Sequence, residues 1–328
     1  MFELNIFNLN ANKIVYLDQK GWIDLAKIYY GNPTVVEREL LKKILQASDG
    51  GTAVFPFSLV NMSETASIKK PRWRQDLASL MIKVSKYCTL TPYWDRMLEL
   101  EIQNLILDKV GLPLINIREH FVRKGFSWLM GAQLIATSEN WEPKQLEKLN
   151  RWLQEKLDDP KTLEFLIANQ PYHDPQLKKK DLIAVKTFER IRKNLRSIKD
   201  NEMRRKASFL QNTYATVFPK FARIAYDMGV PAEFVKKHFF TKFDIDDFIE
   251  KLPTALCEFT LLFQRDQQLE RPIKLNDMED IWHLTLSIPH SDIVVTEKMW
   301  ASIAKRAKLD KKCNTVILSS LKDLDKFL

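Results

Sequence analysis

Four acidic side chains follow or flank short apolar runs near the two ends of the chain. Asp18 comes directly after VYL, Glu64 lies beyond the second apolar run, Asp280 lies early in a helical pattern, and Glu297 follows IVVT. Carboxylates held close together raise one another's pKa unless a cation neutralises them. An all-oxygen set without His or Cys suits Mg²⁺ or Mn²⁺. Two such ions about 3.5–4 Å apart can activate a water and stabilise the leaving oxygen in phosphodiester hydrolysis.

The same apolar runs predict the strands that would position these acids. NKIVYLD at 12–18 and TAVFPFS at 52–58 are continuously apolar, which is typical of parallel strands covered on both faces. Helical periodicity between them indicates a βαβ opening, and further strand candidates are CTLTP at 88–92, DIVVTE at 292–297 and NTVILSS at 314–320. Because the carboxyl ends of parallel strands meet at one edge, we expect the four carboxylates to point at one rim.

The middle of the chain shows the periodicity of helices rather than of strands. From about residue 105 to residue 271, apolar stripes recur at helical spacing, with no convincing strand between them. We therefore predict an α/β fold, in which a parallel sheet flanked by helices is built from residues 1–104 and 272–328. A large all-helical insertion at 105–271 would interrupt this discontinuous domain.

Several residues around the acidic motifs have a structural interpretation. Ser58 fits as the N-cap of the helix that carries Glu64. Asn276 fits as the N-cap of the late helix and Glu279 as its capping-box partner, which places Asp280 at the fourth helical position. Asp277 and Glu279 would then each stabilise the helix N-terminus by about 0.3–1 kcal/mol. Asp292 is interpreted as a strand-start or turn residue.

The net charge of +9 is concentrated in one segment. Residues 178–206 hold twelve Lys and Arg against four Asp and Glu, and an apolar stripe from Leu182 to Ile198 leaves the basic side chains on the opposite face. Such a face is either a solvated helix surface or a phosphate-binding surface. In the second case the candidate contacts to nucleic acid are Lys179, Lys180, Arg192, Lys193 and Arg196.

Trp73 and His283, which lie near the acidic motifs, can each be interpreted in two ways. In KKPRWRQ at 69–75, Arg72 and Arg74 flank Trp73, which either packs in the core or stacks on a base beside a phosphate. His283 lies one helical turn from Asp280 and is either a buried structural histidine or a donor to the metal ligands or a phosphate.

Other functional classes are disfavoured. Cys88, Cys257 and Cys313 are far apart and odd in number, so we expect reduced core residues. The five histidines have no zinc-ligand spacing. No apolar run reaches the roughly 18 residues of a membrane span, and the N-terminal segment lacks signal-peptide features. The expected location is therefore the cytoplasm, without a membrane partner.

The four acidic segments also resemble a known family. VYLD at 15–18, FPFSLVNMSET at 55–65, NDMEDIWHL at 276–284 and DIVVTEKMW at 292–300 resemble, in order and context, the four acidic motifs of PIN-domain ribonucleases. The resemblance implies a PIN-like fold and a metal-dependent endoribonuclease, with Asp18, Glu64, Asp280 and Glu297 as the ligands of Mg²⁺ or Mn²⁺. It covers roughly 160 residues at the two ends of the chain and none of the helical middle.

The sequence departs from the family pattern, and these departures leave other functions open. Gln19 and Lys20 stand where a small polar residue is usual, and Lys298 stands where the fourth acid more often lies. One alternative is a PIN-like module that no longer cleaves and binds RNA or another protein. Another is a structure-specific DNA nuclease, since contacts to the 2′-OH cannot be located in the sequence. If the large insertion covers the site, a regulatory protein partner would be needed to open it.

Overall fold

A four-stranded parallel sheet joins segments from the two ends of the chain. The computed structural model describes residues 12–92, 94–130, 142–169, 175–268 and 271–328. The strands lie in the order β2 (Ala53–Val54), β1 (Lys13–Leu17), β5 (Ile293–Val295) and β6 (Val316–Leu318), and the register pairs Leu17 with Val295. The predicted α/β class and the sharing of one sheet by both chain ends are confirmed.

Both faces of the sheet are buried, which explains the unbroken apolar strands. Along β1, Ile14 and Tyr16 belong to one core cluster, whereas Val15 and Leu17 belong to the other. Successive side chains of a strand point to opposite faces, so a strand covered on both sides needs an apolar residue at every position.

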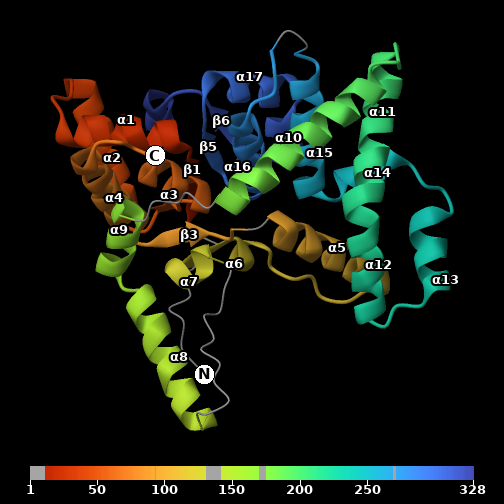
Figure 1. Ribbon diagram of the computed structural model, residues 1–328, viewed down its shortest axis with the longest axis horizontal. Coiled ribbons are helices and arrows are strands. Elements are labelled where there is room, and N and C mark those ends of the chain that lie inside the picture. Colours follow the sequence, from red (N-terminus) through yellow and green to blue (C-terminus); the bar gives the residue numbers. More distant parts are fainter. Residues whose placement is uncertain (1–11, 93, 131–141, 170–174, 269–270) are drawn as a thin grey trace.

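Different groups of helices cover the two faces (Figure 1). The face that carries Val15 packs against α1 (Gln19–Tyr30), α2 (Val35–Asp49), α3 (Leu59–Ala66), α4 (Pro71–Ser85), α9 (Pro160–Asn169) and the 3₁₀ turn η3 (Leu321–Lys326). The face that carries Tyr16 packs against α5 (Trp94–Val110), α15 (Pro253–Asp266), α16 (Leu275–His290) and α17 (Lys298–Arg306).

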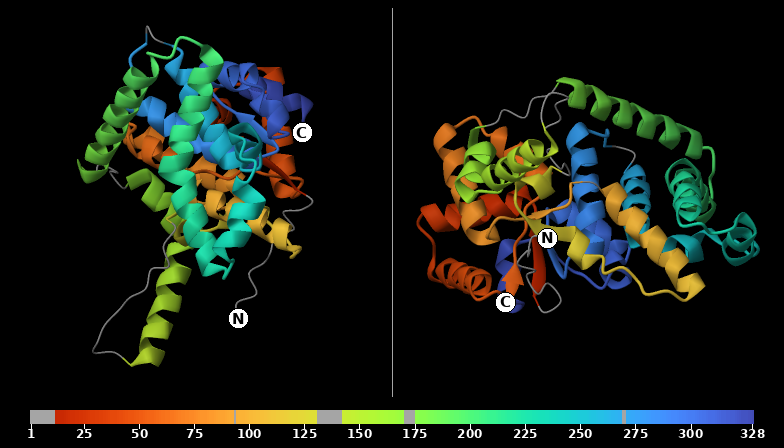
Figure 2. Two further views of the ribbon diagram at one scale, coloured as in Figure 1. Left: turned by 90° about the vertical axis from the view of Figure 1, so that its right-hand side faces the viewer. Right: turned by 90° about the horizontal axis from the view of Figure 1, so that it is seen from below.

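Most of the remaining elements lie between residues 105 and 271. They are α6 (Arg118–Phe121), β4 (Val122–Lys124), α7 (Phe126–Leu129), α8 (Pro143–Leu157), α10 (Pro175–Leu195), α11 (Asn201–Asn212), η1 (Thr213–Val217), α12 (Phe218–Asp227), α13 (Ala232–Val235), η2 (Lys236–Phe240) and α14 (Ile245–Glu250), and α18 (Leu309–Lys312) follows near the C-terminus. Helix α8 extends away from the body of the molecule (Figure 2), and none of its side chains, all of which the structure describes, is buried. No helix of the described ranges has the length and apolarity needed to cross a bilayer.

The prediction of an all-helical middle was wrong at one place. Strand β4 pairs antiparallel with β3 (Cys88–Leu90) in a second, two-stranded sheet. The segment VRK is too short to show an alternation of apolar and polar residues, so only the pairing with β3 reveals it. CTLTP is therefore a strand as predicted, but it meets the parallel sheet only through an isolated bridge between Phe57 and Thr89.

The basic segment at 178–206 is two helices rather than one. α10 ends at Leu195 and α11 begins at Asn201, where the side chain of Asp200 accepts a hydrogen bond from Met203 N at 2.7 Å. Asp is a favoured N-cap because its carboxylate satisfies a free N–H of the first helical turn. The apolar stripe that begins at Leu182 ends at Ile198, between the two helices.

The helical middle and the sheet share one apolar core. Tyr16 of β1, Phe221 of α12 and Phe259 of α15 belong to a single buried cluster. The proposed boundary at residue 104 also falls inside α5. The division into two domains stays a prediction, and the shared cluster indicates that the two parts stabilise each other.

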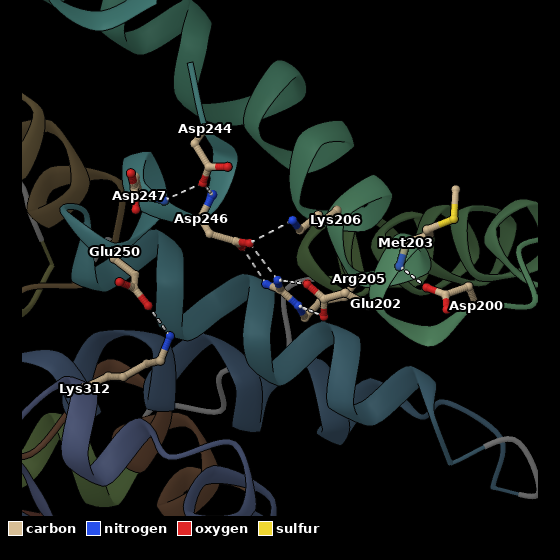
Figure 3. Close-up of polar contacts among 10 residues, drawn as sticks. All are labelled: Asp200, Glu202, Met203, Arg205, Lys206, Asp244, Asp246, Asp247, Glu250 and Lys312. Carbon is tan, nitrogen blue, oxygen red and sulfur yellow. Dashed lines mark hydrogen bonds and ion pairs between the residues drawn. The ribbon is translucent and has the colours of Figure 1, made fainter. Parts of the chain in front are cut away.

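Polar contacts at the surface tie the middle segment to the C-terminal end (Figure 3). Arg205 of α11 forms ion pairs with Glu202 on its own helix and with Asp246 of α14, at 2.6 and 2.7 Å. Glu250 of α14 is paired in turn with Lys312 of α18. The two links span 41 and 62 residues of the chain, so that α14 connects α11 to α18.

Candidate functional site

The first candidate ligand, Asp18, is fixed by the end of the sheet. Its backbone N–H donates to Val295 O at 2.9 Å, which continues the pairing of β1 with β5 by one residue. Its Oδ1 accepts a hydrogen bond from Gly21 N at 2.8 Å, so the carboxylate is the N-cap of α1. Asp18 is only 4% exposed. Its backbone and one carboxylate oxygen are therefore held by neighbours on two elements.

Glu297 and Asp280 are brought together by α17. Glu297 lies two residues beyond β5 as the N-cap of α17, and in the described chain its exposed side chain makes no capping hydrogen bond. One turn later, the indole Nε1 of Trp300 donates to Asp280 Oδ2 at 2.7 Å. Trp300 is buried, so this contact fixes Asp280 of α16 beside the start of α17.

Glu64 is positioned by α3, which begins just after β2. Ser58 is the N-cap of α3 as predicted, and Asn61 completes its capping box. The side chain of Gln19, directly after Asp18, donates to Thr65 Oγ1 at 3.0 Å and accepts from Asn61 Nδ2 at 3.5 Å. Gln19 thereby joins α1 to α3, which gives a physical reason for a long amide at a position where PIN-domain proteins usually have a small polar residue.

The carboxylates act on one another electrostatically. Burial raises the pKa of Glu64 to about 8, with further increases from the charges of Asp280, Glu279, Asp18 and Glu297. Burial raises the pKa of Asp280 to about 7, opposed by the Trp300 hydrogen bond and reinforced by Glu297 and Asp18. Burial also raises the pKa of Asp18 to about 6, and Glu297 adds to this effect. These contributions show that the four charges lie within electrostatic reach of one another, whereas their meeting at one rim as metal ligands stays a prediction.

The burial of Glu64 leaves one of its carboxylate oxygens uncompensated. Glu64 Oε2 is buried and has no hydrogen-bond partner among the described residues. A buried carboxylate oxygen without a partner is costly unless a proton or a cation compensates for it. Among the described residues, no three Asp, Glu, His or Cys side chains form a group that could hold a metal ion as they stand.

A fifth carboxylate, that of Glu279, belongs to the cluster and was not predicted as part of it. The charge of Glu279 raises the pKa of Glu64 more than the charge of Asp18 does. The prediction that Asn276 and Glu279 form the capping box was wrong, because α16 begins two residues earlier than predicted, at Leu275, and its N-cap is Lys274. Asp277 takes the capping role instead, since its Oδ2 accepts from Lys274 N at 2.8 Å. The sequence offered one signal, namely a second acid directly beside Asp280.

Asp277 itself is the first-turn acid that the sequence predicts. It is buried and forms ion pairs with Arg265 at 2.9 Å and with Arg271 at 2.8 Å. Asp292 also has its predicted structural role, because it precedes β5, accepts a hydrogen bond from Ile14 N at 2.7 Å and pairs with Arg118 at 2.9 Å. These two acids are therefore occupied by structural partners.

Tyr16 and His283 lie beneath the carboxylates in the core. The Tyr16 hydroxyl shares a hydrogen bond with Ser58 Oγ at 3.2 Å, and burial raises its pKa well above the usual value, helped by Asp18, Glu64 and Asp280. The His283 ring packs edge-on against Tyr16 at 5.7 Å between centroids, and burial lowers its pKa to about 3. His283 is thus neutral and buried, but neither ring nitrogen has a hydrogen-bond partner among the described residues, and its Nε2 lies 3.8 Å from Asp280 Oδ1. Nothing in the sequence singled out Tyr16.

The candidate phosphate contacts on α10 and just beyond it differ in how far their side chains are buried. Arg192 is buried and paired with Asp266 of α15 at 2.8 Å, so the prediction that it contacts nucleic acid was wrong. The apolar residues around it are Phe188, Ile191 and Leu195 of α10 and Leu262 and Phe263 of α15. Lys193 and Arg196 are exposed, as a phosphate-binding face requires. The side chains of Lys179 and Lys180 lie outside the described residues.

Of the two arginines that follow α3, only one has a fully exposed side chain. The Arg72 side chain is exposed, with a long contact of 3.9 Å to Asp76. Arg74 is half-buried and donates to Ala66 O at 3.3 Å, which stabilises the end of α3. Trp73 is 58% exposed, so the interpretation as a core packing residue was wrong.

Comparisons with known proteins do not assign the chain to a family. No protein-family model, no curated protein and no solved structure matches it. The resemblance to PIN-domain ribonucleases therefore rests on the four acidic segments and on their order in the chain.

Proposed function

We propose that this chain is a PIN-like, Mg²⁺- or Mn²⁺-dependent endoribonuclease. One observation carries the proposal. Asp18, Glu64, Asp280 and Glu297 come from four elements spread over 280 residues, yet their charges act on one another at the carboxyl edge of a parallel sheet. A fold does not place several buried like charges together without a compensating interaction elsewhere. The unpartnered Oε2 of Glu64 supports a cation as that compensation.

The roles of the residues follow from their positions. Asp18, Glu64 and Asp280 would hold the metal, with the exposed Glu297 at the side open to solvent. A bound Mg²⁺ or Mn²⁺ supplies positive charge for the phosphate oxygens and acidifies water. Hydrolysis joins a water oxygen to phosphorus and breaks one P–O ester bond, and the leaving oxygen takes up a proton.

The surface of α10 supports a nucleic-acid substrate. Helix α10 contacts α16, which carries Asp280, and crosses it in Figure 1. The exposed Lys193 and Arg196 lie in the last turn of α10 and just beyond it. Cations beside a carboxylate metal site can hold the phosphates that flank the scissile bond. RNA is the substrate that the PIN resemblance favours.

Cleavage of a labelled RNA in Mn²⁺ tests the proposal through two isosteric substitutions. Asp18→Asn keeps an acceptor for Gly21 N, and Asp280→Asn keeps one for Trp300, so both variants should fold. We expect cleavage to fall at least about 100-fold in each, because each loses a charged ligand. Asp49→Asn, an exposed acid paired with Lys86, is the matched control. Equal cleavage by all four proteins would refute the assignment, and a matching DNA strand decides between the two sugars.

A second measurement separates a nuclease from a module that has lost its metal. Excess Mn²⁺ at about 100 times its dissociation constant should stabilise the wild-type fold by roughly 2.7 kcal/mol. Asp280→Asn should show a much smaller increase in melting temperature. If Mn²⁺ stabilises neither protein while RNA still binds, the chain is a non-cleaving RNA-binding module.

A further inference from the structure

A groove between α1 and the segment around α4 is not explained by the carboxylate cluster. It has a volume of about 740 Å³, and its apolar walls come from Ile23, Ala26, Tyr30, Ile68, Trp73 and Leu77. A volume of this size is in the range of sites that bind small ligands. In the described chain the groove lies open, so its apolar walls face solvent.

Two aromatic rings stand on opposite walls of this groove. Tyr30 at the end of α1 is 47% exposed, and Trp73 in the first turn of α4 is 58% exposed. Both residues line the same groove. Aromatic rings that remain this exposed forgo the stability that burial would give, and a flat apolar ligand that stacks on them would recover it.

The rim of the groove is basic. Lys27 and Arg72 line it, and Lys70 places its Nζ 4.0 Å from the centre of the Trp73 ring. The sequence KKPRWR at 69–74 brings four cations around Trp73 with no acid among them. Asp76 is the acid of the lining, and it is engaged by Arg72 at 3.9 Å. Stacking rings within a basic rim match the two parts of a nucleotide, its base and its phosphate.

The groove begins beside the carboxylate cluster. Asp18 caps the N-terminus of α1, and at 1.5 Å per residue Ile23 and Tyr30 lie about 8 and 18 Å further along that helix. Glu64 lies on α3, and Ile68 of the lining follows it by one turn. One wall of the groove is therefore the helix that Asp18 caps, and the other wall, on α4, follows directly after the helix that carries Glu64.

We propose that this groove is a base-binding subsite for single-stranded RNA, in which one unpaired base contacts Trp73 and Tyr30 while Arg72 and Lys27 contact the adjoining phosphates. The inference rests on the proposed nuclease function and gives its substrate class, namely RNA with an unpaired base a few nucleotides from the scissile bond. A double-stranded segment cannot present a base to such a groove, because its bases are stacked and paired.

Binding of a labelled single-stranded RNA to the full chain in EDTA tests the subsite without cleavage. Trp73→Ala should weaken binding roughly 5- to 100-fold, the range for loss of one stacked base. Trp152→Ala is the matched control, since Trp152 is 53% exposed on the distant α8. Tyr30→Phe should bind as the wild type does, whereas Tyr30→Ala should bind more weakly. Arg72→Gln should lower the slope of log affinity against log salt by about 0.7.

An RNA with a run of abasic sugars separates stacking from charge. It keeps every phosphate, so the wild type should bind it more weakly than the intact RNA, and Trp73→Ala should show a smaller difference between the two RNAs. The subsite is refuted if Trp73→Ala matches Trp152→Ala, or if an intact and an abasic RNA bind the wild type equally well. RNA binding that depends on Trp73, together with cleavage that survives Asp18→Asn, would retain the subsite and reject the proposed metal site.

Discussion

Glu258 offers a direct test of how burial controls charge in this protein. It lies in α15 in the shared core, 8% exposed, and its Oε2 has no hydrogen-bond partner among the described residues. Burial raises the pKa of its carboxyl from the usual 4.5 to about 8, with a further increase from Asp95 and a decrease from Lys220. The unfolded chain ionises near 4.5, so between about pH 4.5 and 8 only the unfolded state gives up this proton.

The free energy of unfolding should therefore fall as the pH rises through this window. Each pH unit corresponds to about 1.4 kcal/mol, so the whole window amounts to on the order of 3 to 5 kcal/mol from Glu258. Glu258→Gln removes this dependence and keeps the size of the side chain. Its stability relative to the wild type should rise by that amount between pH 4.5 and 8, and should be constant below and above.

Urea unfolding at about pH 5, 6.5 and 8 measures the difference between wild type and variant. Other buried acids change the stability of both proteins in the same way, so the difference isolates Glu258. Glu155→Gln, an exposed position on α8, should follow the wild-type curve. Parallel curves for Glu258→Gln and the wild type would refute the reasoning, since they would mean that Glu258 is ionised in the folded protein.

Three further substitutions examine how the candidate site is held. Asp18→Ala should unfold more easily than Asp18→Asn by about 1 kcal/mol, because only Asn keeps the cap on Gly21 N; urea unfolding of the two variants measures this. Asp277→Asn should lower the free energy of unfolding by about 3–5 kcal/mol, because it leaves the fully buried Arg265 without a countercharge, and wild-type stability in the same assay would contradict this. Gln19→Ala should cost about 0.5–1.5 kcal/mol and reduce the stabilisation by Mn²⁺ in thermal unfolding, because α1 and α3 lose their link; an unchanged Mn²⁺ response would show that the link does not position the ligands.

The sheet was predictable because its strands depend on local sequence, whereas the role of the four acids stays a prediction. The strands that carry Tyr16 and Val294 show unbroken apolarity, which parallel strands buried on both faces require. Residues that directly follow such strands must lie at the carboxyl edge, so the positions of Asp18 and Glu297 follow from the strand ends alone. Ser58 was identifiable as an N-cap for the same reason, since its role depends on residues only three positions away.

The errors concern contacts between distant segments. Arg192 has the sequence environment of a surface cation, and only the position of Asp266 on another helix explains its burial. Strand β4 exists because β3 pairs with it. The predicted start of α16 was wrong because Arg265 and Arg271 hold Asp277 in the capping role. The local preference for Asn at an N-cap does not reveal these ion pairs.

The carboxylate cluster is held in place by groups that do not neutralise it. An amide, that of Gln19, links α1 to α3, and an indole N–H, that of Trp300, fixes Asp280. Two cations of the neighbouring segments form ion pairs with other acids, since Lys20 pairs with Asp24 and Arg265 pairs with Asp277. A cluster meant only for stability would be expected to use such cations directly, because unpaired buried charge is costly. Uncharged supports leave the negative charge of the cluster uncompensated by these residues, as the proposed metal site would require.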